Sequence, residues 1–293
     1  MTNSTEHIIL LFYKFTHISD PEALRERELA VGKVLGLTGR MLIAEEGING
    51  TFEGTRDAVE KYKKHLVSDP RFKKMSFKES LGNGNGFNKL KIKVRDEVVT
   101  LGAGKLNPSQ DTATELSASE LERWYEENED FVVLDLRNSY EIVSGYFDRT
   151  IDPGLKNFRD LPEKLKELKS DPRLKNKKIV TVCTGGIRCE KATCLMKQEG
   201  FTDVYQLKDG IHTYMQKYPS KRFKGTLFVF DNRMTTPVVE MERREVVGAC
   251  TFCQKKTEHY VNDDSTVPST KMLCCEECHK ERSPRLRAVV PTV

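Results

Sequence analysis

Apolar and polar positions follow two different patterns along the first hundred residues. Short apolar runs alternate with segments in which apolar side chains recur every three or four positions. Read in order, these segments predict strand, helix, strand, strand, helix, strand and strand. This order is typical of a ferredoxin-like α+β sandwich, which we expect over residues 1–110. The expected strands cover residues 7–15, 40–44, 48–52, 75–78 and 90–94, and the expected helices cover residues 21–35 and 55–66.

The pattern changes beyond a stretch at residues 102–114 that we interpret as a linker. Ser117 and Glu120 then form a capping box ahead of a helix, and buried-type strands alternate with helices. This alternation predicts an α/β domain with a parallel sheet over residues 115–222, and residues 223–293 form a small Cys-rich extension. Its expected strands are 131–135, 179–182 and 204–207, with helices at 161–168, at about 190–200 and after Gly210.

Composition places few limits on function. Among 293 residues, 38% are hydrophobic and 31% are charged, and the formal net charge is +4. The apolar stretch at residues 8–15 is too short to span a bilayer and contains Lys14, and no cleavable leader is evident. We therefore expect a cytoplasmic protein with no membrane partner. In that compartment the eight cysteines are better suited to catalysis or metal binding than to disulfides.

Cys183 is the leading candidate for chemistry. It ends a β-branched strand and opens a glycine-rich loop that is followed by Arg188. Backbone N–H groups, a helix N-terminus and the Arg188 cation would all favour thiolate over thiol, so we expect an ionised and accessible sulfur. The alternatives are a buried structural cysteine and a solvated surface arginine. The other members of the expected active-site loop are Thr184, Gly185, Gly186 and Ile187.

Other residues near this loop have less certain roles. Cys189 could resolve an oxidised or persulfidated Cys183, or it could be a half-buried helix residue. Cys194 fits core packing. Asp135 and Arg137 fit a structural ion pair beneath the site better than direct chemistry.

Two segments of the N-terminal region are candidates for binding. Lys89, Lys91 and Lys93 lie on or beside one expected strand, where alternate side chains share a face. They could hold nucleic-acid phosphates or could form a solvated face. Residues 45–51 could form a binding edge for RNA or for the reactive loop, or they could serve only a turn. The glycine-rich run at residues 82–86 predicts a mobile loop.

The C-terminal extension carries two C-x2-C units separated by 21 residues. Four thiolates from two such units can close a tetrahedral zinc shell. Cys274 and His259 are alternative ligands, and free thiols are the alternative interpretation. No NAD, flavin or haem motif and no 2-His-1-carboxylate triad is present. The expected zinc ligands are Cys250, Cys253, Cys275 and Cys278.

Several of these pieces together resemble a rhodanese domain over residues 115–222. They are Asp-Leu-Arg at 135–137, Tyr-Glu at 140–141, the loop 183–188, and Leu-Lys-Asp-Gly-Ile at 207–211, where Asp209 stands in place of a usual second glycine. Three longer stretches are similar to one subfamily, the rhodanese-related tRNA uridine hydroxylases. These stretches are residues 183–192, residues 43–51 and Phe-Val-Phe-Asp at 228–231.

The resemblance implies a specific activity. Members of that family place a hydroxyl group on C5 of the wobble uridine, position 34 of tRNA, using molecular oxygen and a reductant. Rhodaneses carry sulfur as a cysteine persulfide, and the matching position is Cys183. The implied partners are the tRNA anticodon loop and a sulfur or electron donor protein. Where the family has a further cysteine pair between the zinc knuckles, this chain has Asn-Asp-Asp-Ser at 262–265.

Two other functions compete with this one. The first is a plain sulfurtransferase that passes persulfide sulfur from Cys183 to a small thiol or to a tRNA-thiolation partner. It would leave the N-terminal and Cys-rich regions without a role. The second is a non-enzymatic redox-sensing or binding module, against which the intact cysteine loop counts.

Overall fold

The computed structural model of the protein describes residues 6–239, 245–265, 269–282 and 286–288. The chain forms two compact units. The first comprises Met1–Ala113 together with the helical segment Glu190–Leu195, and the second comprises Thr114–Cys189 and Met196–Val293. Each unit has its own sheet and its own apolar core.

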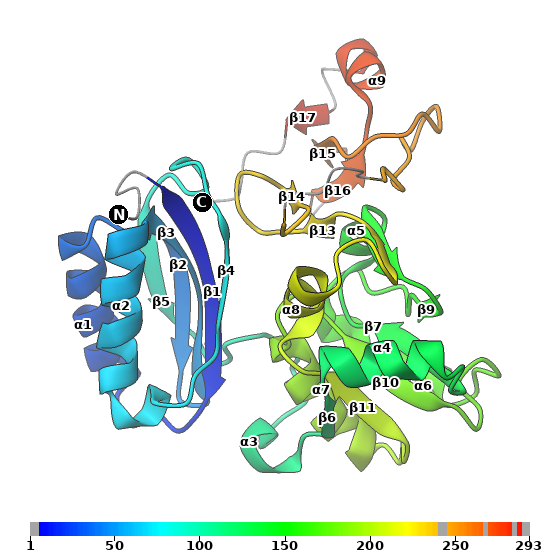
Figure 1. Cartoon of the computed structure of the whole chain (residues 1–293), viewed down its shortest axis with the longest axis horizontal. Coiled ribbons are helices and arrows are strands. Elements are labelled where there is room, and N and C mark those ends of the chain that lie inside the picture. The colour runs from blue at the N-terminus through cyan, green and yellow to red at the C-terminus, as the bar shows by residue number, and fades with distance from the viewer. Residues whose placement is uncertain (1–5, 240–244, 266–268, 283–285, 289–293) are drawn as a thin grey trace. The chain divides into compact units, whose positions relative to one another are not determined.

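The first unit is the predicted ferredoxin-like α+β sandwich. Its sheet has the strand order β4-β1-β3-β2-β5, in which β5 pairs parallel to β2 at one edge and the other neighbours are antiparallel. Two helices, α1 (Pro21–Val34) and α2 (Arg56–Ser68), lie side by side on one face of the sheet (Figure 1). The strands are β1 (His7–Phe15), β2 (Thr38–Ala44), β3 (Gly47–Thr55), β4 (Phe77–Leu81) and β5 (Leu90–Val94).

Local sequence signals place the two helices correctly. The Asp20 and Thr55 side chains cap them by accepting hydrogen bonds from the N–H groups of Ala23 and Ala58. Alternate residues of β1 reach the core beneath the helices, where aromatic rings pack edge to face. The strand expected at 75–78 is wrong in position, because β4 begins at Phe77 and a 3-10 turn (η1, Pro70–Phe72) precedes it.

The glycine-rich run at residues 82–86 is anchored, contrary to the expectation of a mobile loop. The buried carboxylate of Glu53 accepts hydrogen bonds from the backbone N–H groups of Asn83, Gly84 and Gly86, at 3.1, 2.8 and 2.7 Å. A Cβ atom at Gly82 would lie 2.4 Å from a Glu53 oxygen. The glycines therefore let the backbone wrap closely around one carboxylate.

The second unit contains the predicted parallel sheet, in the order β6-β11-β10-β7-β9 with every pairing parallel. The short strand β6 follows the linker region and was missed by sequence reasoning. A short helix, α3 (Pro108–Asp111), lies within the stretch interpreted as linker. The strands are β6 (Thr114–Leu116), β7 (Phe131–Asp135), β9 (Thr150–Ile151), β10 (Lys178–Val182) and β11 (Val204–Leu207).

The helices of this unit follow the expected order, with one shifted start. The capping box of Ser117 and Glu120 is formed at α4. The helix after the reactive loop, α7, begins at Ile187, three residues before the expected start near Glu190. The helices are α4 (Ala118–Glu126), α5 (Ser139–Ile142), α6 (Leu161–Leu168), α7 (Ile187–Gln198) and α8 (Gly210–Lys217), with a 3-10 turn, η2 (Phe158–Asp160), before α6. The middle of α7, Glu190–Leu195, belongs to the first unit.

The remaining elements are short and belong to the second unit. Strand β8 (Gly145–Phe147) pairs with β12 (Phe223–Gly225), and β13 (Leu227–Phe228) pairs with β14 (Thr235–Thr236). The Cys-rich region forms a three-stranded antiparallel sheet in the order β16-β15-β17. It consists of β15 (Tyr260–Asp263), β16 (Thr270–Leu273), β17 (Leu286–Ala288) and helix α9 (Glu276–Glu281).

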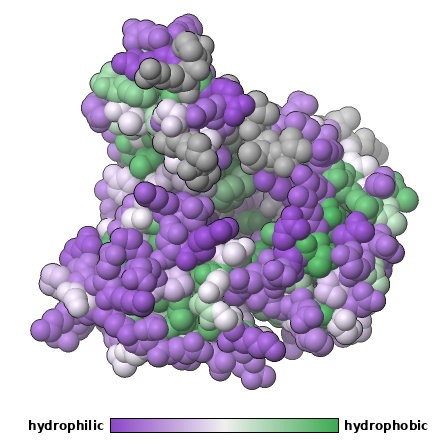
Figure 2. Space-filling model, turned by 180° about the vertical axis from the view of Figure 1, so that it is seen from behind, coloured by the Kyte–Doolittle hydropathy of each residue, from purple (hydrophilic) through white to green (hydrophobic). Residues whose placement is uncertain are grey.

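Hydrophilic residues cover most of the face that Figure 2 shows, in keeping with the high charged fraction. None of the helices in the described part of the chain has the length and apolar character needed to span a bilayer.

Candidate functional site

Cys183 lies directly after β10, at the carboxyl edge of the parallel sheet, where ligands of such sheets bind. Its sulfur accepts a hydrogen bond from the Gly186 N–H at 3.2 Å. The side chain is fully buried, so the accessible sulfur expected from the sequence is wrong. The turn from β10 to α7 is short, since α7 already begins at Ile187.

The thiol of Cys183 is acidic despite this burial. Burial alone would raise its pKa. Hydrogen bonds from the Cys189 thiol and from the backbone N–H groups of Cys189 and Gly186, together with the positive charge of Arg188, lower the pKa from 9.0 to about 6. The expectation of an ionised sulfur therefore agrees with the geometry around it.

Arg188 is held inside the protein rather than solvated at its surface. Its two terminal nitrogens donate to the two carboxylate oxygens of buried Glu141, at 2.7 and 2.8 Å. One of them also lies 3.4 Å from the Thr184 hydroxyl. Burial lowers the pKa of Arg188, but Glu141 outweighs this effect and raises it above the usual value. The guanidinium thus stays charged, and a carboxylate balances that charge.

A second buried ion pair fixes Glu141. Arg137 and Asp135 pair directly, with Nη2 of Arg137 2.7 Å from Oδ2 of Asp135 and neither side chain exposed. Arg137 also donates to the carbonyl oxygens of Glu141 at 3.2 Å and of Gly145 at 2.7 Å. This is the structural ion pair that the sequence predicts. It holds the backbone of the segment that presents Glu141 to Arg188.

The two neighbouring cysteines of α7 have different surroundings. Cys189 is buried, and its thiol is hydrogen-bonded to the sulfur of Cys183. Burial, followed by this contact with Cys183, raises the pKa of Cys189 well above its ordinary value. These pKa shifts favour Cys189 as the thiol and Cys183 as the thiolate of the pair. Cys194 is buried elsewhere on the helix and donates to the Glu190 carbonyl at 3.2 Å, as expected for a packing residue.

Helix α8 supports the loop from its other side. The N–H groups of Ile211 and His212 donate to the carbonyl oxygens of Cys183 and Thr184, at 2.9 and 3.0 Å. A Cβ atom on Gly210 would lie 2.7 Å from the Cys183 carbonyl oxygen, so only glycine fits there. Asp209 has a φ of 59°, a left-handed conformation that Asp tolerates better than most residues. Its presence where a glycine is usual thus leaves the turn intact.

Sequence reasoning missed a buried lysine in the first unit. Nζ of Lys191 donates to Glu46 at 2.8 Å, to the Val99 carbonyl at 3.2 Å, and to Glu97. Residues 45–51 thus include a carboxylate that binds a segment of α7. Nothing in the local pattern around Lys191 pointed to acceptors so far away in the sequence.

Lys89, Lys91 and Lys93 lie at the edge of the first sheet. Lys91 and Lys93 are partly exposed on β5 and alternate with Ile92, which enters the core. The pKa of Lys91 is lowered, first by desolvation and then by the positive charges of Lys93, Arg40 and Arg95. No ion pair to an acidic group is seen for these three lysines in the described part of the chain. They form a locally uncompensated positive strip.

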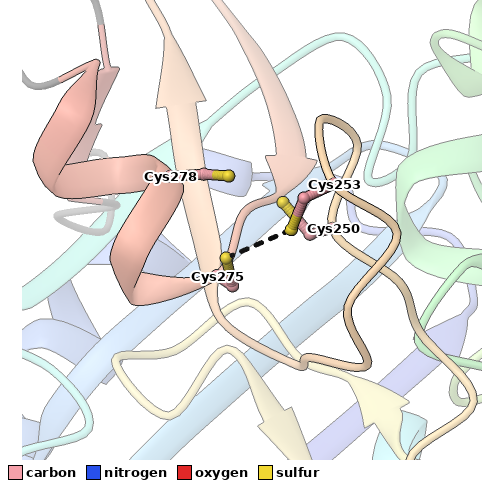
Figure 3. Close-up of side chains that lie close together, drawn as sticks. All are labelled: Cys250, Cys253, Cys275 and Cys278. Carbon is pink, nitrogen blue, oxygen red and sulfur yellow. Dashed lines mark hydrogen bonds between the residues drawn. The ribbon is translucent and has the colours of Figure 1, made fainter.

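The four predicted zinc ligands converge (Figure 3). Their sulfur atoms all lie within 4.8 Å of one another, and those of Cys253 and Cys275 are 3.6 Å apart. Sulfur atoms around one tetrahedral zinc lie about 3.8 Å apart, given Zn–S bonds of about 2.3 Å. The alternative ligands lie outside this group, and Nδ1 of His259 instead contacts the Cys274 carbonyl at 2.8 Å. The donor set therefore fits zinc.

Comparison with known proteins agrees with this architecture. Residues 7–98 match the family described as UPF0176 acylphosphatase like domain, residues 117–217 the rhodanese-like domain, and residues 224–286 the family described as Rhodanase C-terminal. A tRNA uridine(34) hydroxylase of Cytophaga hutchinsonii is 38% identical, with 93% of this chain and 86% of that protein covered. The protein of that name from Bacillus licheniformis is 41% identical, with 93% of this chain and 84% of that protein covered. The one from Legionella pneumophila is 42% identical, with 78% of this chain and 89% of that protein covered.

Proposed function

The chain belongs to the tRNA uridine(34) hydroxylase family, and we propose that it hydroxylates the wobble uridine of tRNA in the cytoplasm. The observation that carries this proposal is the similarity to proteins of that name over most of the chain, with the reactive loop included. The product is 5-hydroxyuridine. The enzyme is thus an oxidoreductase that acts on RNA.

The reaction replaces the hydrogen on C5 of the uracil ring by a hydroxyl group. Molecular oxygen supplies that oxygen atom, and its second atom leaves as water. A reductant supplies the two electrons and two protons that this balance requires. The substrate base must leave its stack to expose C5, which is easiest in the single-stranded anticodon loop.

Cys183 is the nucleophile in this proposal, as a thiolate or as a persulfide. The low pKa of its thiol supports the role, because the thiolate is the reactive form. Arg188 holds the negative charge, and Cys189, already in contact with the sulfur, resolves oxidised or persulfidated Cys183. Since Cys183 is buried, its surroundings must open for the base to reach it.

The positive strip of Lys89, Lys91 and Lys93 supports contact with tRNA phosphates. Uncompensated lysines at a sheet edge attract a polyanion and release its counterions on binding. A sulfur or electron donor protein would be a further, transient partner.

The Cys-rich cluster would hold one structural zinc ion. Four thiolate ligands leave no open coordination position, so the metal contributes folding stability and takes no part in the reaction. The ligands are Cys250, Cys253, Cys275 and Cys278.

The decisive experiment incubates purified protein with an unmodified tRNA transcript, a reductant and oxygen, and measures nucleoside masses. We expect 5-hydroxyuridine that is lost without oxygen and in the Cys183→Ala variant. The Cys194→Ala variant is the matched control, because Cys194 is also buried and its thiol donates to the Glu190 carbonyl as a packing residue. Wild-type hydroxylation by Cys183→Ala would remove Cys183 from the mechanism.

A sulfurtransferase activity is the second candidate, favoured by the rhodanese-like domain at residues 117–217 with its cysteine loop intact. Here the outer sulfur of a Cys183 persulfide passes to an acceptor thiolate, and the Cys183 thiolate is regenerated. Loss of thiolated nucleosides rather than 5-hydroxyuridine, in cells that lack the gene, would select this function. A non-enzymatic module would leave both nucleosides unchanged.

A further inference from the structure

Asn138 belongs to the same hydrogen-bonded group as the reactive loop. It lies shortly after β7, at the edge of the parallel sheet where Cys183 follows the neighbouring strand β10. The backbone N–H of Asn138 donates to Oε1 of Glu141 at 2.9 Å, and the same oxygen accepts a hydrogen bond from Nη1 of Arg188 at 2.7 Å. One carboxylate oxygen thus links Asn138 to the cation that stabilises the Cys183 thiolate.

The side chain of Asn138 is buried with one acceptor left over. The residue is only 8% exposed. Its Nδ2 donates to the Tyr140 hydroxyl at 3.0 Å, whereas its Oδ1 has no hydrogen-bond partner in the described part of the chain. The Glu141 N–H donates to the backbone carbonyl of Asn138 at 2.8 Å. A buried carbonyl oxygen without a donor is unfavourable, and native proteins rarely retain one unless it serves a purpose.

The chain on the far side of Asn138 is held firmly. The carbonyl oxygen of Tyr140 accepts a hydrogen bond from the Tyr260 hydroxyl at 2.6 Å, and the carbonyl oxygen of Glu141 accepts one from Arg137 at 3.2 Å. The amide of Asn138 is in turn held by the Tyr140 hydroxyl. Packing and hydrogen bonds of this kind fix the orientation of residues that bind a ligand.

The unpaired oxygen limits the ligand to one that presents a hydrogen-bond donor. The amide also has a second N–H beside this oxygen, because its bond to Tyr140 uses only one of the two hydrogens on Nδ2. The Watson–Crick edge of uracil carries an N3–H donor between two carbonyl oxygens, and enzymes that act on an extruded base read it through that edge. Cytosine has an acceptor at N3 and would place it against Oδ1. The pattern on Asn138 therefore fits uracil and disfavours cytosine.

We propose that Asn138 selects uracil in the active site, with Oδ1 accepting from N3–H and Nδ2 donating to a neighbouring carbonyl oxygen of the base. This inference rests on the proposed function, which supplies uridine as the substrate. The base reaches Asn138 when the surroundings of buried Cys183 open, as access to the thiolate requires. Since C5 and N3 lie on different edges of the ring, Asn138 holds the base while C5 stays available for the chemistry.

Binding of anticodon stem-loops without oxygen or reductant tests this role. The stem-loops differ only at position 34, which carries uridine, 3-methyluridine or cytidine. We expect the wild type to bind the uridine form about tenfold more tightly than the other two, as expected for a pair of hydrogen bonds to a base edge. Asn138→Ala should lose this preference. Asn138→Asp keeps an acceptor oxygen, so it should still prefer uridine to 3-methyluridine.

Asn157→Ala is the matched control. Asn157 also precedes a short helical turn in the same unit, and its backbone N–H donates to Asp160 at 2.8 Å, but its side chain is exposed. This variant should keep the wild-type preference for uridine. Thermal unfolding of each variant shows whether the fold is retained, and the comparison of uridine with 3-methyluridine on the wild type needs no substitution.

Two results would overturn the selection of uracil by Asn138. In the first, the wild type binds all the stem-loops alike. In the second, Asn138→Ala weakens them in proportion and keeps the preference, as a residue that only supports the turn would do. The proposed reaction is judged separately, because a protein that prefers uridine through Asn138 but forms no 5-hydroxyuridine would refute hydroxylation and retain the specificity residue.

Discussion

Replacing Cys189 with alanine should make Cys183 a weaker acid. The Cys189 thiol is hydrogen-bonded to the Cys183 sulfur, and that contact is the largest of the effects that lower the pKa of Cys183. Alanine removes this donor and leaves the Gly186 N–H and the Arg188 charge in place. The perturbation therefore isolates one interaction within a buried site.

The expected magnitude follows from the size of the total effect. The pKa of Cys183 falls from 9.0 to about 6, which corresponds to about 4 kcal/mol in favour of the thiolate at about 1.4 kcal/mol per pH unit. A hydrogen bond to a charged group contributes about 1.5–3 kcal/mol. Its loss should raise the pKa by about one to two pH units, to about 7–8. At pH 7 the ionised fraction of Cys183 would then fall from about nine-tenths to between one-half and one-tenth.

The assay follows the alkylation rate of the Cys183 peptide by mass spectrometry between pH 5 and pH 9, the range of about two units on either side of neutrality in which thiolates of this kind titrate. Limited access of the reagent to Cys183 lowers the alkylation rate by the same factor at every pH. The midpoint of the rate against pH therefore reports the pKa of the thiol. Cys194→Ala, on the same helix, should keep the wild-type midpoint. The reasoning fails if Cys189→Ala titrates like the wild type, or if Cys194→Ala shifts by the same amount.

Three further predictions concern the metal cluster, the loop support and the positive strip. Metal analysis should find one zinc ion per chain in the wild type and in Cys274→Ser, and none in Cys253→Ser. If the wild type held no zinc and its four cluster cysteines titrated as free thiols, the zinc site would be refuted. Denaturant unfolding should show that Gly210→Ala lowers the free energy of unfolding by about 1–3 kcal/mol more than Gly154→Ala. Both glycines have a positive φ, but only a Cβ atom at Gly210 would clash with neighbouring backbone atoms. Equal losses of stability in the two variants would contradict this. The logarithm of the tRNA-binding constant should fall less steeply with the logarithm of salt concentration in a Lys91→Gln, Lys93→Gln variant, with a slope smaller by about 1.4–1.8. Lys164→Gln, which removes a lysine paired with Glu167, should leave that slope unchanged.

Local signals in the sequence were enough to predict most elements. Thr55 and the pair Ser117–Glu120 mark helix starts, because capping depends on residues only three positions apart. The order of strands and helices along the chain identified both sheets, because each element shows its own local periodicity. The start of α7 at Ile187 was missed because two glycines looked like a longer loop and apolar periodicity becomes clear only beyond Glu190.

Pairings across long stretches of chain could not be predicted. Glu141 and Arg188 are 47 residues apart, and Glu53 anchors amides about 30 residues away. The residues next to a carboxylate in the sequence do not indicate which distant residue it will bind in the folded protein. The same applies to the support of the reactive loop, because the N–H groups of Ile211 and His212 in α8 bind the Cys183 and Thr184 carbonyls from far along the sequence.

The charge balance of the site limits how it can open. Asp135 neutralises Arg137 and Glu141 neutralises Arg188, so the thiolate of Cys183 adds an excess negative charge to a fully buried region. The hydrogen bonds from Cys189 and Gly186 and the charge of Arg188 must therefore offset the cost of burial. Moving the loop or the start of α7 would break these bonds and return the thiol towards its ordinary pKa. A substrate that meets a thiolate must accordingly enter by displacing other elements, while the turn from β10 to α7 remains in place.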